Sequence, residues 1–167
     1  MYPAPQDIQL RFPDAVIGIG EAFGELTVSV RKERIVEVCR ALRDDPAWSF
    51  DFLSDVLAVD FPDAEERFEV IYHLYSIDKH HRVRLKARVR EDDCRIESVT
   101  SVWAGANFME REVYDLMGVE FLNHPDLRRI LLTDEFDGFP LRKDYPTEGR
   151  GWRSTFEFLP TTDGPVA

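Results

Sequence analysis

The stretch "RFEVIYHLYSIDKHHRVRLKARVR", residues 67–90, carries the clearest strand patterns in the chain. In its second half, apolar residues at every other position face one side, and they are Val83, Leu85, Ala87 and Val89. Its first half has apolar side chains on both faces, so we expect both faces of that strand to be covered. Residues 78–81 are typical of a hairpin turn, which predicts that the two strands pair in antiparallel fashion.

Two further strands and two helices are predicted around this hairpin. Residues 25–30 alternate like a half-buried strand, and residues 48–60 begin with the same alternation before becoming continuously apolar. A helical stripe with spacing i, i+3, i+4, i+7 is formed by Ile35, Val38, Cys39 and Leu42. A second helix is predicted over residues 106–117, with a stripe of Met109, Val113 and Leu116 bordered by Phe108. Gly118 is placed to end it.

The order β-α-β-β-β-α predicts an α+β fold, with a mainly antiparallel sheet of about four strands and two helices. We expect this domain at residues 20–119. A loose lead-in with three prolines precedes it at residues 1–19, and an extended C-terminal docking tail follows at residues 120–167.

Composition restricts the class of protein. The net charge is −11, from 32 acidic and 21 basic residues, and this argues against a nucleic-acid binder. No apolar run approaches the ~18 residues of a membrane helix, and the N-terminus lacks the pattern of a secretory signal. The two cysteines, Cys39 and Cys94, form no CxxC pattern and fit a reducing compartment. A role at a membrane would therefore require a partner that holds the chain there.

The five basic residues of the strand at 82–90 are the best argument for nucleic-acid binding. Aromatic residues for base stacking are not interleaved among them, and acidic residues are plentiful nearby. An ion-paired sheet face is the preferred interpretation. A stand-alone nucleic-acid-binding domain is kept as the alternative from a different class.

No pattern indicates a catalytic or metal site. His80 and His81 diverge from a turn without a third ligand, and there is no nucleophile elbow or phosphate-binding glycine loop. On the second helix, Arg111 and Asp115 are expected to pair on the surface at i, i+4. Glu112, close to the apolar stripe, is a candidate for a perturbed carboxylate, but no second catalytic group accompanies it.

The stretch "NHPDLRRILLTDEFDGFPLRKDYP", residues 123–146, has two basic clusters and an acidic run. Pro125 suits the first position of a short helix, for which Leu127, Ile130 and Leu131 would form the apolar stripe. A turn and an extended arm are predicted after it. Its regularly placed apolar residues argue against a disordered tail. We interpret it as a docking element whose arginines bind carboxylates or carbonyls of a partner.

The blocks "ANFMEREVYDLMGVEFLNHPDLRRILL" (106–132) and "GFPLRKDYP" (138–146) resemble the C-subunit family of proton-translocating NADH:quinone oxidoreductase, respiratory complex I. The earlier segments fit the same family in order and spacing, so the resemblance covers about residues 26–146. This chain departs from the family pattern at Phe139, where many members have histidine, and at Phe136, where they have tryptophan.

The resemblance implies a cofactor-free structural and assembly subunit of the hydrophilic arm, which supports quinone reduction coupled to proton translocation. Iron–sulfur clusters, FMN and quinone would belong to partner subunits. The implied partners are the hydrogenase-like D subunit and the cluster-bearing B subunit, and the implied location is the cytoplasmic side of the bacterial membrane. The alternative within the superfamily is the equivalent subunit of a membrane-bound hydrogenase, or of a complex fed by ferredoxin or another donor.

The resemblance also assigns a scaffold and interface role to the residues that match the family motif. On the helix these are Glu110, Arg111, Glu112, Tyr114, Asp115 and Gly118. In the tail they are His124, Pro125, Asp126, Leu127, Arg128, Arg129, Gly138, Pro140, Leu141, Arg142, Lys143 and Asp144.

Overall fold

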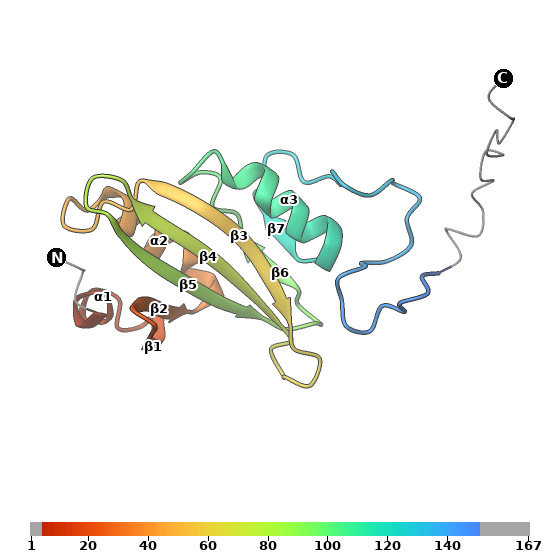
Figure 1. Ribbon diagram of the computed structural model, residues 1–167, viewed down its shortest axis with the longest axis horizontal. Helices are drawn as coiled ribbons and strands as arrows, with labels where there is room; N and C mark the ends of the chain where they lie inside the picture. Colours follow the sequence, from red (N-terminus) through yellow and green to blue (C-terminus); the bar gives the residue numbers. More distant parts are fainter. Residues whose placement is uncertain (1–4, 151–167) are drawn as a thin grey trace, which may run out of the picture.

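A mixed five-stranded sheet with the strand order β1-β2-β5-β4-β3 is the centre of the computed structural model, which describes residues 5–150 (Figure 1). The elements are α1 (Pro5–Arg11), β1 (Val16–Ala22), β2 (Glu25–Val30), the 3-10 turn η1 (Lys32–Arg34), α2 (Ile35–Asp44), β3 (Phe52–Asp60), β4 (Phe68–Ser76), β5 (His81–Val89), β6 (Arg95–Glu97), α3 (Ala106–Met117) and β7 (Glu120–Leu122). The α+β class predicted from the sequence is confirmed.

The predicted hairpin is β4 and β5, which pair in antiparallel register from Phe68↔Val89 to Ser76↔His81. His80 adopts a positive φ of 54° in the turn between them. The alternating residues of β5 are buried as predicted, and β4 is buried along almost its whole length. This hairpin therefore supplies the two central strands against which the other elements pack.

The sheet differs from the expected one in its edge and in one pairing. Strand β1 comes from residues that we expected mostly in a loose lead-in, and it raises the strand count from about four to five. Gly18 and Gly20 interrupt its apolar pattern, which conceals the strand in the sequence. Strand β2 pairs parallel to β5 because the chain crosses through α2 before it returns. A separate two-stranded parallel sheet joins β6 and β7.

The helices fill the core on the inner face of the sheet. All four stripe residues of α2 are fully buried, as predicted, and this helix lies behind β4 and β5 in Figure 1. Helix α3 packs beside β3, but its buried face is rotated from the predicted stripe. It buries Ala106, Glu110, Val113 and Met117, whereas Phe108 is 66% exposed. The predicted stripe was built from apolar residues alone, so it left out Glu110, a charged residue that is buried.

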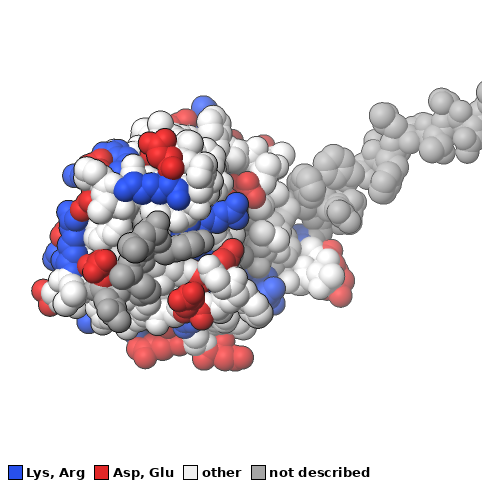
Figure 2. Space-filling view, turned by 60° about the vertical axis from the view of Figure 1, so that its left-hand side comes forward, with Lys and Arg blue, Asp and Glu red and all other residues white. Residues whose placement is uncertain are grey.

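The basic strand is ion-paired on its outer face, as predicted. Lys86 and Arg88 both bind the carboxylate of Glu69, at 2.8 and 3.0 Å, and Arg90 pairs with Glu65 and Asp92. Figure 2 shows acidic and basic residues interspersed on the face that it turns forward, without one continuous basic patch. The exposed pairs of Arg90 contribute only about 0.2–1 kcal/mol each. The buried carboxylate of Glu69 needs Lys86 and Arg88 as counterions.

The helices of residues 5–150 are too short or too polar to cross a bilayer.

One core residue offers a direct test of the packing. Tyr72 is fully buried, and its hydroxyl has no hydrogen-bond partner among the described residues. Replacing Tyr72 with Phe should therefore raise the free energy of unfolding by about 1 kcal/mol, since an unsatisfied buried hydroxyl is removed at constant shape. Tyr72→Ala is the contrasting variant, because its cavity should lower stability by about 3–5 kcal/mol. Urea unfolding measures both, and a loss of stability in Tyr72→Phe would contradict the described hydroxyl environment.

Candidate docking surface of the C-terminal segment

Residues 123–150, here called the C-terminal segment, contain no helix or strand and lie against α3 and the end of the sheet (Figure 1). The short helix predicted from Pro125 is therefore wrong. Side chains of α3 bind the backbone of the segment in another conformation. Oδ2 of Asp115 accepts hydrogen bonds from the N–H groups of Ile130, Leu131 and Leu132, at 3.0, 2.8 and 2.9 Å.

Arg111 binds the same part of the segment from the neighbouring turn of α3. Its Nε donates to the carbonyl oxygen of Arg128 at 3.1 Å. Arg111 and Asp115 are both buried, so they do not form the solvent-exposed pair that was predicted from their spacing. Nη1 of Arg129 lies 3.4 Å from Oδ1 of Asp115, close enough for ion pairing but outside hydrogen-bond geometry.

Gly118 connects the end of α3 to the segment. It ends the helix with a left-handed φ of 74°, as predicted, and its N–H donates to the carbonyl of Tyr114 at 2.9 Å. A Cβ at this position would lie 2.6 Å from the ring of Phe139 and 2.7 Å from Nη2 of Arg142. Glycine is therefore needed both for the backbone conformation and for the close approach of the segment.

Arg142 is held inside the molecule. Its guanidinium carbon lies 4.8 Å from the ring centroid of Phe68 and 4.6 Å from that of Phe139, and its Nε donates to the carbonyl of Met117 at 2.7 Å. Arg142 is therefore engaged within the chain, and its contact with a partner stays a prediction. Phe139, one of the two departures from the family pattern, supplies an aromatic face for this packing.

Further contacts between the C-terminal segment and the sheet lie at the end of the β3–β4 hairpin. The guanidinium of Arg67 binds Asp60 in two-pronged fashion at 2.8 and 2.9 Å and reaches Oδ1 of Asp144 at 2.8 Å. The N–H of Lys143 donates to Oδ2 of Asp60 at 2.7 Å. The hydrogen bonds from Arg67 hold the pKa of the Asp60 and Asp144 carboxyls below their ordinary values. Asp60 and Arg67 were not predicted as site residues, because no local pattern indicates their contacts with Lys143 and Asp144.

Besides Asp115, α3 buries the carboxylate of Glu110, whereas Glu112 is exposed. The prediction of a perturbed Glu112 is therefore wrong by half a turn of helix. Glu110 accepts hydrogen bonds from the Ser98 hydroxyl at 2.6 Å and the Val99 N–H at 2.8 Å. Burial raises its pKa to about 7 against these two bonds. The side chain of His124 is also fully buried, with Nε2 at 3.9 Å from Oε2 of Glu110.

The remaining motif residues divide between contact and solvent. Tyr114, Leu127, Gly138 and Pro140 are half-buried. Pro125, Asp126, Arg128, Leu141, Lys143 and Asp144 are exposed. Arg128 is 72% exposed as a side chain and pairs with Asp126 at 3.0 Å, while Leu131 and Leu141 are 60% and 51% exposed. We call Phe108, Arg128, Leu131 and Leu141 the docking surface, since they combine exposed apolar groups with an accessible guanidinium.

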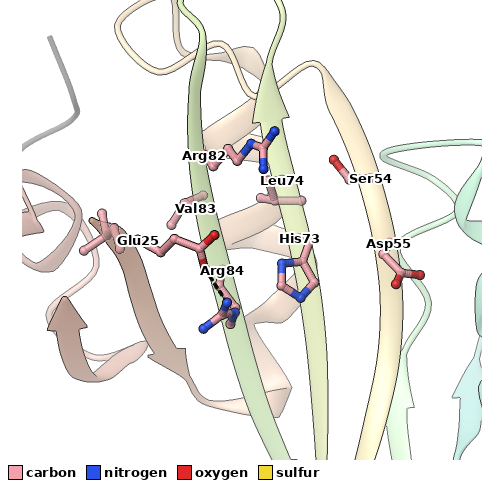
Figure 3. A pocket seen from close by; sticks show the side chains of 9 residues that line it. Glu25, Ser54, Asp55, His73, Leu74, Arg82, Val83 and Arg84 are labelled. Atoms are coloured by element: carbon pink, nitrogen blue, oxygen red, sulfur yellow. Dashed lines mark hydrogen bonds and ion pairs between the residues drawn. The ribbon is translucent and has the colours of Figure 1, made fainter. Parts of the chain in front are cut away.

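Two depressions on the surface are candidate ligand sites. One of about 330 Å³ in the segment is lined in part by Leu132, Phe136, Pro140 and Tyr145. The other, of about 270 Å³, crosses the outer face of the sheet, where Glu25 pairs with Arg84 beside His73 (Figure 3). Burial and the charge of Arg84 lower the pKa of His73. Within residues 5–150, no group of three His, Cys, Asp or Glu residues is placed to hold a metal ion.

Gly118→Ala should displace the segment from α3. Gly24 is the matched control, because its φ is also left-handed at 78° but a Cβ there would meet nothing within 4 Å. Gly24→Ala should lower the free energy of unfolding by about 1 kcal/mol through backbone strain alone, and Gly118→Ala by at least about 1 kcal/mol more. Chemical denaturation compares the two variants. Equal losses would show that Phe139 and Arg142 move aside without cost.

Asp115→Ala should release the part of the segment around residues 130–132. Three backbone N–H groups lose their acceptor, so we expect a loss of about 3 kcal/mol or more in unfolding free energy and faster trypsin cleavage after Arg128 and Arg129. Glu112→Ala, an exposed acidic position on the same helix, should change stability by less than about 0.5 kcal/mol. Cleavage at the same rate in both variants would mean that Asp115 does not hold the segment.

Known proteins resemble this chain in sequence and in fold. The chain matches the family model described as "Respiratory-chain NADH dehydrogenase, 30 Kd subunit" over residues 28–151. It is 51% identical over 140 residues to the C subunit of the NADH-quinone oxidoreductase of Geobacter sulfurreducens, covering 83% of this chain and 85% of that protein. It is 48% identical over 142 residues to the C subunit numbered 2 of the NADH-quinone oxidoreductase of Rhizobium etli, covering 85% and 75%.

Two solved structures share the fold. The structure titled "Nqo5 of the trypsin-resistant fragment (1-134)" is 35% identical, with a TM-score of 0.61, and covers 73% of this chain and 95% of that one. A chain of the membrane-bound sulfane sulfur reductase, an archaeal respiratory membrane complex, has a TM-score of 0.74 and covers 96% of each chain. At 23% identity, the second likeness concerns the fold alone. The family match and the identities near 50% agree with the motif of residues 106–132 and 138–146. The chain belongs to the family of the 30 kDa subunit, also called the C subunit, of the respiratory-chain NADH dehydrogenase, the NADH-quinone oxidoreductase.

Proposed function

We propose that this chain is a structural subunit of an NADH:quinone oxidoreductase and carries no catalytic centre of its own. The observation that carries the proposal is how the polar groups of the motif are engaged. Asp115, Arg111 and Arg142 bind the chain's own backbone and aromatic rings, and Asp144 binds Arg67. Groups engaged in this way position the C-terminal segment, and they are not available to activate a substrate.

The docking surface has the character of a protein interface. Leu131 and Leu141 project from a segment whose backbone is fixed by contacts to α3 and to the end of the sheet. Exposed apolar side chains and an exposed arginine such as Arg128 are typical of residues at protein interfaces. Because the segment is already ordered, binding a partner requires little further loss of conformational entropy.

We infer that the partners are the hydrogenase-like D subunit and the cluster-bearing B subunit, as the family resemblance implies. The iron–sulfur clusters, FMN and quinone would lie in such partner subunits. The same resemblance implies a peripheral position on the cytoplasmic side of the bacterial membrane, where the complex holds the chain. The division between a domain at residues 20–119 and a tail from residue 120 stays a prediction, and its last part, residues 151–167, lies outside the described residues.

The second candidate is the equivalent subunit of a complex with another electron donor. This candidate comes from the family resemblance, and the fold shared with a chain of the archaeal sulfane sulfur reductase is compatible with it. Identities near 50% to C subunits of NADH-quinone oxidoreductases favour the NADH-dependent complex. A stand-alone nucleic-acid-binding domain has less support, because the basic residues of β5 are engaged with carboxylates such as Glu69.

The double variant Leu131→Asp and Leu141→Asp should weaken assembly without unfolding the chain. Both side chains are more than half exposed, so urea unfolding of the isolated chain should change by less than about 0.5 kcal/mol per site. Two buried charges at an interface should cost several kcal/mol of binding, which is enough to remove the chain from the complex. The measurement is mass spectrometry of the proteins that co-purify with the tagged chain from gently solubilised membranes.

Leu10→Asp is the control, because Leu10 is 78% exposed on α1, away from the segment. It should co-purify with the same partners as the unmodified chain. Wild-type recovery of partners by the double variant would refute the docking surface. Recovery of a hydrogenase-like subunit without any NADH-binding flavoprotein would favour the second candidate.

A further inference from the structure

Glu110 is a carboxyl group in the core with no cationic side chain of residues 5–150 paired to it. Its side chain is 0% exposed, and within this part of the chain it forms no ion pair with lysine or arginine. Its two strong contacts are uncharged donors, the Ser98 hydroxyl and the Val99 N–H. A buried carboxylate that lacks a counterion retains its proton to higher pH than a solvated one. Glu110 is therefore positioned to exchange a proton near neutrality.

The hydroxyl groups beside it accommodate both protonation states. Ser98 Oγ lies 2.6 Å from Oε2 of Glu110 and 2.8 Å from Oγ1 of Thr100. When the carboxyl is neutral, its O–H can donate to Ser98, whose own hydrogen then points to Thr100. When it is ionised, the Ser98 hydroxyl rotates and donates to Oε2. The backbone does not have to move for the proton to leave.

His124 joins the first residues of the C-terminal segment to this site. Its Nδ1 accepts the N–H of Asp126 at 3.0 Å, so Nδ1 carries no hydrogen. The hydrogen is on Nε2, which donates to the carbonyl of Asn107 at 3.1 Å and lies 3.9 Å from Oε2 of Glu110. The geometry thus defines a neutral imidazole beside the carboxyl. Protonation of His124 would break its bond to Asp126.

The other titratable groups that face Glu110 are Cys39 of α2 and Tyr72 of β4. Burial raises the pKa of both groups, and the negative charge of ionised Glu110 raises it further. Both remain uncharged at neutral pH and cannot balance an ionised carboxylate. Loss of the proton therefore leaves a charge that has two uncharged donors, Ser98 and Val99, and that water would stabilise further.

Water has one direction of entry that requires little structural change. Cys39 and Tyr72 belong to a helix and a central strand, whereas His124 belongs to a stretch without regular structure. Its neighbours Asn123, Pro125 and Asp126 are exposed. Segments with few backbone contacts open at lower free energy than core elements do. Displacement of His124 would hydrate Glu110 and leave the sheet intact.

We propose that Glu110 and His124 form a proton-binding site that controls how firmly the start of the C-terminal segment is held to α3. With the proton bound, a neutral carboxyl and a neutral imidazole pack side by side. With the proton released, the segment loosens at His124. This inference does not depend on the proposed function, since it concerns the stability of the chain alone.

The first test compares the full chain with Glu110→Gln, which keeps one donor and one acceptor but cannot ionise. Burial raises the pKa of Glu110 from its ordinary 4.5 to about 7, so the stabilisation is present below about pH 4.5 and is lost as the pH rises through 7. Between pH 5 and pH 8, the unfolding constant of the wild type relative to Glu110→Gln should rise on the order of 50-fold. Urea unfolding at each pH gives this ratio.

The ratio of the two unfolding constants removes the titrations of groups that do not contact Glu110. Burial lowers the pKa of His73 and of His81, which titrate in the same window with the opposite sign and cancel between the two proteins. Glu112→Gln, the exposed neighbour, should show a constant ratio to the wild type. A constant ratio for Glu110→Gln as well would overturn the proposal.

The second test uses the unmodified chain and does not depend on how a variant folds. Infrared difference spectra between pH 6 and pH 8 should show the carbonyl band of a protonated carboxylic acid disappearing with a midpoint near pH 7. The absence of such a band would also overturn the proposal.

Trypsin cleavage after Arg128 tests the link to the segment, with rates corrected by a peptide of the same local sequence. Cleavage should accelerate several-fold from pH 6 to pH 8 in the wild type and stay constant in Glu110→Gln. Cleavage after Arg11, at the end of α1, should be unaffected in both. An equal acceleration after Arg128 in both proteins would exclude control of the segment by this site.

Discussion

A single buried carboxylate oxygen, Oδ2 of Asp115, satisfies three consecutive backbone N–H groups of a segment that has no regular structure. Backbone polar groups that leave water need partners, and a segment without helix or strand cannot supply them itself. Helix α3 provides these partners from its side chains, through Asp115 for the donors and Arg111 for an acceptor. The path of the chain after residue 123 depends on these hydrogen bonds between side chains of α3 and the backbone of the segment.

The same constraint explains why several charged residues of the motif are engaged within the chain. A charge that is removed from water must be paired and hydrogen-bonded. Arg67 meets this requirement by binding Asp60 and Asp144, and Arg142 by lying between two aromatic rings. The exposed residues of the segment include the apolar Leu131 and Leu141 beside charged ones such as Arg128. A stretch that looks highly charged in sequence therefore presents a partly apolar surface.

Local patterns were good predictors where one face of an element meets the core and the other meets water. The stripe of α2 and the alternation of β5 were predicted residue by residue, because both elements have apolar and polar faces that do not overlap. The pattern failed for α3, where Glu110 is buried with the apolar residues. It also failed for β1, an edge strand whose glycines carry no side-chain signal. For Glu110 the partner groups, Ser98 and Val99, lie 11–12 residues away, whereas β1 pairs with the neighbouring strand β2 across a two-residue turn.

The sequence by itself determined the α+β class, the central hairpin, the helix-ending role of Gly118 and, through its motif, the family. These features depend on residues a few positions apart, whose spacing along the chain fixes their geometry. Only the tertiary structure decided which charges of the motif are internal. Asp115 meets the segment 15–17 residues later, and Lys143 meets Asp60 across 83 residues. Contacts at such separations depend on how the sheet, α3 and the segment pack together, and spacing alone carries no information about that packing.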